Sequence, residues 1–218
     1  MIDEEFIRRR TIEATLPDGT RIRLRPIVPE DKANILAAWQ RLSPESRYRR
    51  FMSPMDELTP EMLAELTEID YVDHFAWAAF ALDESREPGV GVARYVRVQD
   101  EPEVAEAAVT VVDDYQGRGV GTLLLQALGA VAIENGIKRF RGYVLSDNRA
   151  IRELLEDLGA RVFHHGPGVN VLEVELPSED DIRGSQVYEA LRALARGEGP
   201  ELIRWGGLWS RERGEPSA

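Results

Sequence analysis

Hydrophobic residues form three β-rich runs in the middle of the chain, and a run with helical spacing follows them. Three successive β-rich runs, separated by turns that contain proline, cover residues 75–82, 89–98 and 104–112. Residues 120–134 carry leucine, alanine and valine at helical spacing, and Asn135-Gly136 ends this run. The pattern predicts three consecutive strands followed by a long helix.

The flanking segments predict further strands and helices around this centre. Residues 11–16 and 20–27 have the pattern of a β-hairpin, joined by the turn Pro17-Asp18-Gly19. The other expected elements are helices that begin at Pro29, Ser43-Pro44 and Thr59-Pro60, strands at 140–145, 162–165 and 169–176, and a helix at 149–158. This order predicts an α/β domain.

We expect the α/β domain to occupy residues 18–176, after an N-terminal segment at 1–17. The sequence Pro177-Ser178-Glu179-Asp180-Asp181 breaks the pattern, and helical spacing returns over residues 182–196. Residues 177–218 are therefore expected to form a C-terminal helix and tail, which adds a helical extension to the domain.

Composition and charge exclude several functions. The chain has 218 residues, with 27 basic and 39 acidic side chains and a net charge of −12. This charge argues against nucleic acid and membrane surfaces as partners, because both need a basic face. The absence of cysteine excludes disulfides, cysteine zinc sites and thiol nucleophiles. The sequence has no membrane-length apolar run and no signal-peptide pattern, so we expect a cytoplasmic protein.

The segment between the third strand and the long helix is the most informative part of the sequence. It runs from Val109 to Thr122 and contains Gly117, Gly119 and Gly121. A turn of this kind presents unpaired backbone N–H groups at the positive end of a helix, which is an anion site. It lacks the lysine of a P-loop, and its glycine spacing differs from the dinucleotide-binding fingerprint. From these residues alone, a phosphate site and a turn that only lets the helix pack closely are both open.

Two motifs in order along the chain resemble those of the GNAT N-acetyltransferases. Gln116-Gly117-Arg118-Gly119-Val120-Gly121 is similar to the family's signature, whose amides hold the pyrophosphate of acetyl-CoA. Ser146-Asp147-Asn148-Arg149-Ala150 resembles the family's strand-to-helix turn, whose asparagine contacts the cofactor. The resemblance covers most of residues 18–176.

The resemblance implies a fold and a co-substrate. The fold is a mixed, strongly twisted sheet with helices on both faces, and its 104–112 and 140–145 strands separate so that pantetheine can insert. The co-substrate is acetyl-CoA. The residues implied in binding it are Val109, Thr110, Val111, Gln116, Gly117, Arg118, Gly119, Val120, Gly121, Thr122 and Asn148.

A narrower resemblance concerns the acceptor. Residues 23–27, 41–48, 69–71 and 92–95 are similar to the bacterial protein-lysine acetyltransferases. This branch implies a protein lysine as the acceptor and Glu106, on the strand before the glycine turn, as the general base. A solvent-facing strand charge is the simpler interpretation of Glu106. Leu155 stands where many family members have a tyrosine that protonates the CoA thiolate, so the source of that proton is open.

Several alternatives stay open beside this hypothesis. The acceptor could be a small amine, or the chain could be a non-catalytic module that binds acyl-CoA as a sensor. We expect no metal, because the adjacent His164 and His165 should face opposite sides of a strand. The sequence does not distinguish a monomer from a homodimer.

Overall fold

The structure, a computed structural model, describes residues 4–157, 159–166, 168–178, 192–193, 195–197 and 202–204. Within these residues the strands form one mixed sheet in the order β7-β8-β6-β5-β4-β3-β2-β1-β9. The strands are β1 (Ile12–Thr15), β2 (Arg21–Pro26), β3 (His74–Ala81), β4 (Gly89–Val98), β5 (Glu101–Val111), β6 (Arg139–Leu145), β7 (Arg161–Gly166), β8 (Val169–Glu175) and β9 (Leu202–Arg204). The pairs β5–β6 and β1–β9 are parallel and the others are antiparallel.

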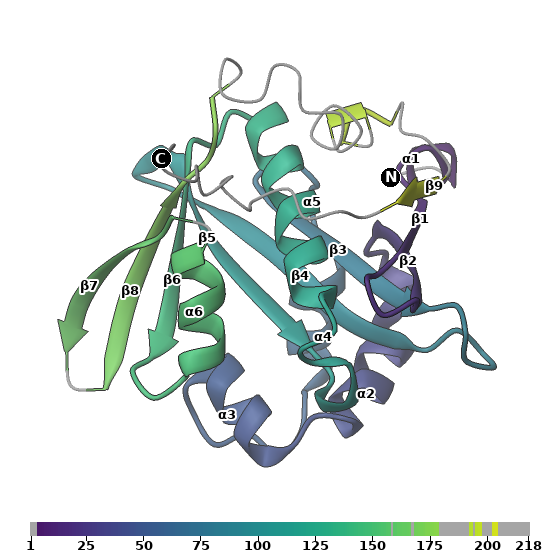
Figure 1. The fold of residues 1–218 in the computed structure, drawn as a ribbon, viewed down its shortest axis with the longest axis horizontal. Coiled ribbons are helices and arrows are strands. Elements are labelled where there is room, and N and C mark those ends of the chain that lie inside the picture. The colour runs from purple at the N-terminus through teal and green to yellow at the C-terminus, as the bar shows by residue number, and fades with distance from the viewer. Residues whose placement is uncertain are drawn as a thin grey trace, which may run out of the picture.

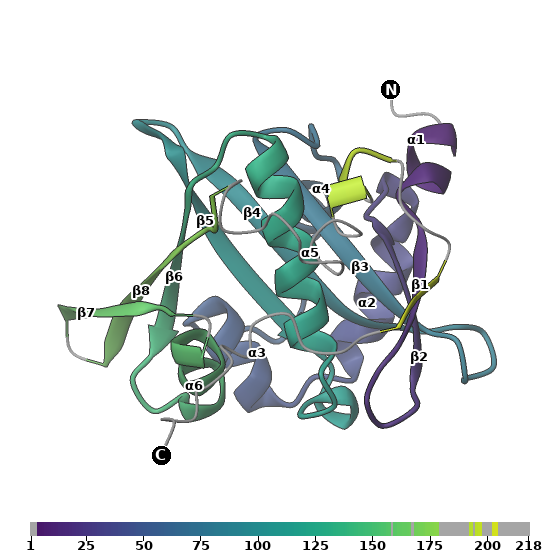
Figure 2. The ribbon, with the colours of Figure 1, turned by 45° about the horizontal axis from the view of Figure 1, so that its top comes forward.

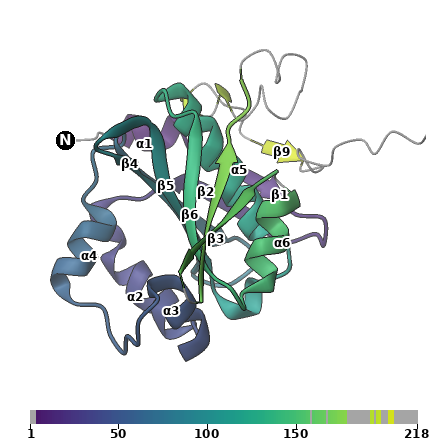
Figure 3. The ribbon, with the colours of Figure 1, turned by 90° about the vertical axis from the view of Figure 1, so that its left-hand side faces the viewer.

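Helices cover both faces of this sheet, as the sequence predicts (Figures 1 and 3). The helices are α1 (Glu4–Arg9), α2 (Lys32–Gln40), α3 (Pro44–Phe51), α4 (Pro60–Thr67), α5 (Val120–Glu134) and α6 (Arg149–Asp157). Helices α2 and α4 lie on one face, whereas α5 and α6 lie on the other. The predicted caps are present, since Ser43 accepts a hydrogen bond from the Ser46 amide at 3.1 Å. The Thr59 side chain accepts one from the Met62 amide at 3.3 Å.

Helix α5 crosses β3, β4 and β5 and packs against them (Figure 2). Leu124 and Leu128 of α5 are fully buried on this face, together with Trp77 and Tyr95 of the sheet. Gly91 makes the close approach possible, because a Cβ atom there would lie 2.9 Å from Leu124 Cδ1. Tight packing of this kind holds the end of β5 and the start of α5 in fixed positions.

Strands β5 and β6 separate in the middle of the sheet. Their parallel pairing extends only from Val104 with Arg139 to Glu106 with Arg141. Beyond that point β5 continues to Val111 and β6 to Leu145, and the two strands diverge in Figure 1. The predicted separation of these strands is therefore confirmed.

Three features of the chain differ from the sequence predictions or lie outside them. Strand β5 begins at Glu101 rather than at residue 104, because a register shift between Arg97 and Val98 accommodates Pro102 near the strand start. Strand β9, which pairs with β1, was not predicted. The predicted helix at 182–196 lies mostly outside the described residues, so the C-terminal helical extension stays a prediction.

The proposed boundary at residue 18 also stays a prediction. Strand β1 precedes it and pairs with β2 from Ile12 with Leu24 to Thr15 with Arg21, so this part of the N-terminal segment belongs to the sheet. No helix among the described residues is long and apolar enough to cross a membrane.

Candidate active site

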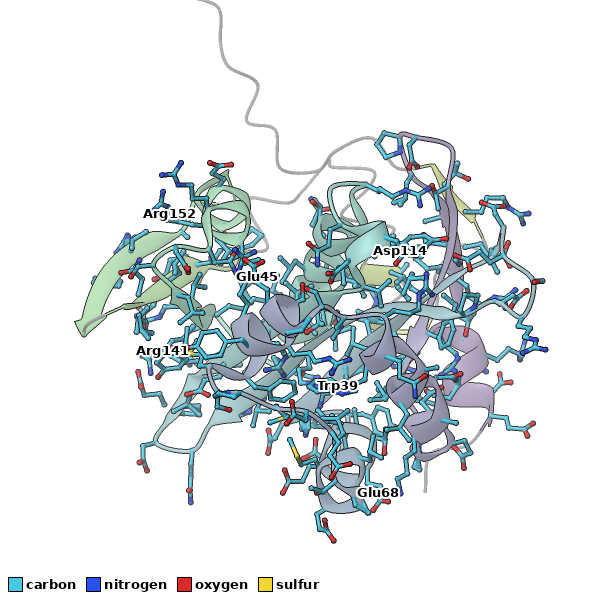
Figure 4. The ribbon with its side chains drawn as sticks, turned by 90° about the horizontal axis from the view of Figure 1, so that it is seen from below. Trp39, Glu45, Glu68, Asp114, Arg141 and Arg152 are labelled. Atoms are coloured by element: carbon cyan, nitrogen blue, oxygen red, sulfur yellow. The ribbon has the colours of Figure 1, made fainter. Side chains whose placement is uncertain are left out.

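A cleft of about 530 Å³ opens where β5 and β6 separate. Its walls come from β5, β6, α5 and α6, and α3 closes one end. Of the predicted cofactor-binding residues, those that line it are Val109, Thr110, Val111, Gln116, Gly117, Gly119, Gly121, Thr122 and Asn148. In the view from below, Glu45 at the start of α3 lies between Arg152 of α6 and Asp114, which follows β5 (Figure 4). The structure thus brings both predicted motifs to one cleft.

The glycine turn carries a row of free amides at the start of α5. Gly117 and Gly119 have φ angles of 71° and 95°, a left-handed conformation that favours glycine. The backbone amides from Gly117 to Thr122 donate to no acceptor within the described part of the chain. Because these amides lie at the positive end of the helix dipole, they form an anion site.

Gln116 connects the turn to β5 and α3. Its Nε2 donates to the Val111 carbonyl at 3.1 Å and to Ser46 Oγ at 3.3 Å. Asp113 Oδ2 accepts from the Ser43 amide at 3.2 Å. Burial raises the pKa of the Asp113 carboxyl, but hydrogen bonds from Ser43 and Ser46 outweigh this effect and leave the pKa lowered. The ionised Asp113 therefore holds α3 against the turn.

Arg118 and Val120 have side chains that do not line the cleft. Arg118 Nε donates to Asp18 Oδ2 at 2.8 Å, and its guanidinium lies 4.5 Å from the centre of the Tyr115 ring. Val120 is fully buried in the core. Both residues can contribute to the anion site only through their backbone amides.

The second motif forms the opposite wall of the cleft. Asn148 directly precedes α6, and its Oδ1 accepts a hydrogen bond from the Ile151 amide at 3.4 Å. Leu155 of α6 and Tyr143 of β6 also line the cleft. Leu155 therefore presents an apolar side chain where the family resemblance implies a tyrosine.

Glu106 lies at the fork between the two strands. It is the last residue of β5 that pairs with β6, and its side chain is exposed. The register pairs Glu106 with Val96 and Ala108 with Arg94, so all four side chains share one face of the sheet. This is the α4 face, because Arg94 donates to the Leu66 carbonyl in α4. Glu106 itself does not line the cleft, although Ala107 and Ala108 beside it do.

Sequence reasoning missed Gln126 and the contribution of α3. Gln126 of α5 is only 4% exposed and lines the cleft, yet neither its Oε1 nor its Nε2 has a hydrogen-bond partner among the described residues. A single amide side chain in the apolar run Leu123–Val131 was a signal that could have identified it. Ser46, Arg49 and Arg50 of α3 also line the cleft.

No group of three metal-ligating side chains occurs among the residues that the structure describes. The side chains of His164 and His165 are not among them, so the predicted absence of a metal stays a prediction.

A separated pair of parallel strands, with an anion-binding turn beside it, defines the acyl-CoA-binding class of transferases that the two motifs resemble. The sequence comparison agrees, since residues 21–161 match the "Acetyltransferase (GNAT) domain" family. The chain belongs to the GNAT acetyltransferases, and the predicted membership is confirmed.

Two curated relatives show which members of the family the chain is similar to. The chain is 40% identical to Acetyltransferase Pat of Mycolicibacterium smegmatis over 178 residues, which cover 79% of this chain and 53% of that protein. It therefore spans about half of that relative's length. It is also 35% identical to Acetyltransferase PA5475 of Pseudomonas aeruginosa over 145 residues, which cover 66% of this chain and 77% of that protein.

Solved structures agree with this assignment. The GNAT domain of S. lividans PAT superposes with a TM-score of 0.72 and 30% identity, over 81% of this chain and all of that domain. The cAMP-binding acyltransferase from Mycobacterium smegmatis gives a TM-score of 0.61 at 33% identity, over 88% of this chain and 55% of that one. The narrower resemblance to the Pat branch is therefore confirmed as well.

Proposed function

We propose that the protein transfers an acetyl group from acetyl-CoA to a primary amine, most simply the side chain of a protein lysine, with Glu106 as the general base. The observation that carries this proposal is the cleft between β5 and β6, which combines a row of backbone amides with a buried glutamine, none of which has a hydrogen-bond partner among the described residues. Both features are incomplete in the protein alone, and acetyl-CoA supplies what each of them lacks.

The residues of the cleft fit the parts of acetyl-CoA. The amides of Gly117–Thr122 suit a pyrophosphate, which needs several N–H donors and a positive helix end. Gln126 can donate and accept, so it suits one of the amide groups of pantetheine. The unpaired edges of β5 and β6 offer further backbone groups to an extended chain inserted between them.

Glu106 supports the chemical step from the other side of the sheet. A lysine ammonium has an ordinary pKa of about 10.4, so it must lose a proton before its nitrogen can attack the thioester carbon. The C–N bond then forms, the C–S bond breaks, the sulfur leaves as a thiolate, and the nitrogen loses its second proton to water as the amide forms. The exposed carboxylate of Glu106 is adjacent to the cleft residue Ala107, where it can take the ammonium proton directly or through one water.

A protein lysine as acceptor rests on the similarity to the two Pat proteins. The name of the first, Acetyltransferase Pat, specifies acetyl transfer, and the narrower sequence resemblance implies lysine. Leu155 cannot protonate the thiolate, so we assign this proton to solvent.

The test is to incubate the protein with isotopically labelled acetyl-CoA and a cell lysate, and then to locate the label by mass spectrometry. Label on lysine side chains supports the proposal in full. Label on small amines alone supports acetyl transfer but contradicts the protein acceptor. Tight acetyl-CoA binding in calorimetry with no labelled product from any amine would contradict the enzyme and favour a sensor module.

A further inference from the structure

A second, smaller cavity adjoins the cleft on the α4 face of the sheet. It has a volume of about 80 Å³ and lies between the sheet and helices α2, α3 and α4. Ala108, Thr110 and Arg50 line both spaces, so the cavity is continuous with the end of the cleft at β5. Its lining is almost entirely apolar apart from a few charged and amide side chains.

Arg94 of β4 is the most buried cation in this cavity. The residue is 7% exposed, and it donates to the Leu66 carbonyl at 3.0 Å and to His74 Nε2 at 3.2 Å. Burial, and secondarily the charge of Arg94, lower the pKa of His74 to about 4, so the ring is neutral. Within the described chain no carboxylate lies within ion-pair distance of Arg94. Both of its protein partners are thus uncharged.

Arg50 of α3 is a second cation for which the described residues provide no counter-ion. Its guanidinium lies 4.9 Å from the centre of the Phe51 ring, and it has no hydrogen bond or ion pair to any described residue. Burial lowers its pKa. The two cations influence each other, because the pKa of Arg94 is lowered to about 9 first by burial and then by the charge of Arg50. At neutral pH both remain charged.

The one carboxylate that lines this cavity does not neutralise them. The Asp31 carboxylate accepts hydrogen bonds from Nη1 and Nη2 of Arg25, both at 2.6 Å. It also accepts one from the Asn34 side-chain amide at 2.8 Å and one from the Val28 backbone amide at 2.9 Å. Several other half-buried arginines pair with carboxylates, as Arg141 does with Glu101 and Glu173, whereas Arg10 and Arg47 donate to backbone carbonyls. The cavity therefore holds two positive charges in excess, in a chain that is acidic overall.

We propose that Arg50 and Arg94 bind a carboxylate group that enters this cavity from the cleft. A planar guanidinium binds a carboxylate by paired, charge-assisted hydrogen bonds, and an apolar surrounding strengthens them. The inference rests on the proposed function, since the cleft is then where the acyl group and the amine meet. The carboxylate can come from two sources: the far end of a dicarboxylic acyl chain on CoA, or an acidic group beside the acceptor amine.

Two matched pairs of probes separate these sources. For the donor, calorimetry compares succinyl-CoA with butyryl-CoA, which have acyl chains of the same carbon number and differ in one carboxylate. For the acceptor, initial rates with acetyl-CoA compare two single-lysine peptides that differ only in glutamate or glutamine beside the lysine. We expect the carboxylate member of one pair to be preferred by about tenfold or more, as one charge-assisted contact provides.

The variants Arg50→Gln and Arg94→Gln should each abolish that preference, and Arg94→Lys should restore part of it. Arg97→Gln is the matched control, because it removes the same charge from the same strand outside the cavity, and the preference should survive. Thermal unfolding checks that each variant is folded, and the more exposed Arg50 provides the test if Arg94→Gln does not fold. Equal use of both members of both pairs by the unaltered protein would overturn the proposal, as would a preference that persists in folded Arg50→Gln. Absence of any acetyl transfer, with acetyl-CoA still bound, would instead contradict the proposed function.

Discussion

The two faces of the sheet carry their polar groups in different ways. On the α5 face, the cleft has backbone amides from Gly117 to Thr122 and the neutral side chain of Gln126. On the α4 face, the polar groups include charged side chains from several elements, among them Arg50 of α3, Arg94 of β4 and Glu106 of β5. The backbone amides of the α5 face suit a ligand of fixed structure. The charges of the α4 face, by contrast, can each be changed by a single substitution.

This difference separates two kinds of energetic contribution. Backbone amides at a helix start are present whenever the helix forms, so the affinity for a phosphate depends on local geometry. Side-chain charges depend on burial and on their partners, and each one can be removed without changing the backbone. Changes on the α5 face should therefore alter the affinity for acetyl-CoA, and changes on the α4 face should alter turnover and the choice of acyl donor or acceptor.

The largest expected effect is on turnover, from Glu106→Gln on the α4 face. The substitution keeps size and hydrogen-bonding shape but cannot take up a proton, so the rate should fall by about 10²–10⁴. Acetyl-CoA affinity should be unchanged, because Glu106 does not line the cleft. Steady-state kinetics at saturating acceptor, with calorimetry for acetyl-CoA, measure both quantities.

Glu103→Gln is the matched control for this variant, because Glu103 is exposed on the same strand and forms an ion pair with Lys138. Its turnover should remain that of the unaltered enzyme. A Glu106→Gln enzyme within a few-fold of the unaltered rate would remove Glu106 from the mechanism and leave it as a surface charge.

The next largest effect is on stability, from Asp31→Asn on the same face. Asp31 is 1% exposed, and the substitution leaves the charge of Arg25 without its carboxylate partner. The free energy of unfolding, measured in urea at pH 7, should therefore fall by about 3–5 kcal/mol. Burial raises the Asp31 pKa, but hydrogen bonds from Arg25, Asn34 and Val28 outweigh it and lower the pKa overall. The stabilisation is therefore present above the ordinary carboxyl pKa of about 3.9 and is lost as pH falls through the lower folded value.

The Asp31→Asn variant and the unaltered protein should therefore have similar free energies of unfolding in strong acid. Glu13→Gln serves as the comparison, since Glu13 is a third exposed and pairs with Arg23 near the surface. Its change should be at most about 1 kcal/mol. An equal loss in both variants would mean that the burial of Asp31 has no special effect.

The difference between the faces also explains what the sequence could predict. Helix α5 was predicted at residues 120–134 and is found at Val120–Glu134, because its apolar spacing and its end at Asn135 are local signals. The glycine turn was equally local, since Gly117 and Gly119 need a left-handed backbone that few other residues adopt. The predicted cofactor site includes Arg118 and Val120 because of their positions in the motif. In the structure the Arg118 side chain pairs with Asp18, and the Val120 side chain packs in the core.

The charged face could not be predicted in the same way. Arg50 and Arg94 belong to separate elements and become neighbours only when α3 folds over β4 and β5. Arg94 lies in the segment 92–95 that resembles the protein-lysine branch, but the sequence does not show that Arg50 and Arg94 lack a carboxylate partner among the described residues, because a missing partner is a property of the fold. The lack of a hydrogen-bond partner for Gln126 among the described residues is also a property of the fold, although the sequence does show a polar residue in an apolar run.

On the α5 face, Gly119→Glu should reduce acetyl-CoA affinity by about 100-fold, or about 2.7 kcal/mol, because a carboxylate would repel the phosphates. Gly136→Glu at the other end of α5 is the control, since Gly136 also has a positive φ, of 78°, and has open space around it. Both variants carry a similar backbone strain, so only the first should lose affinity in calorimetry. Equal affinity in the two folded variants would contradict the phosphate site.

The smallest effect is expected for Gln126→Leu, which should stabilise the fold but weaken acetyl-CoA binding. The buried amide has no hydrogen-bond partner in the described part of the chain, so its removal should raise the free energy of unfolding by about 1–3 kcal/mol. If pantetheine is the missing partner, acetyl-CoA affinity should fall by up to about tenfold, which corresponds to one neutral hydrogen bond. The exposed Gln40→Leu should change stability by no more than about 0.5 kcal/mol and leave affinity unaltered. A Gln126→Leu protein that gains stability and keeps full affinity would show that the orphaned amide has no role in binding, and the α5 face would then hold its ligand by backbone groups alone.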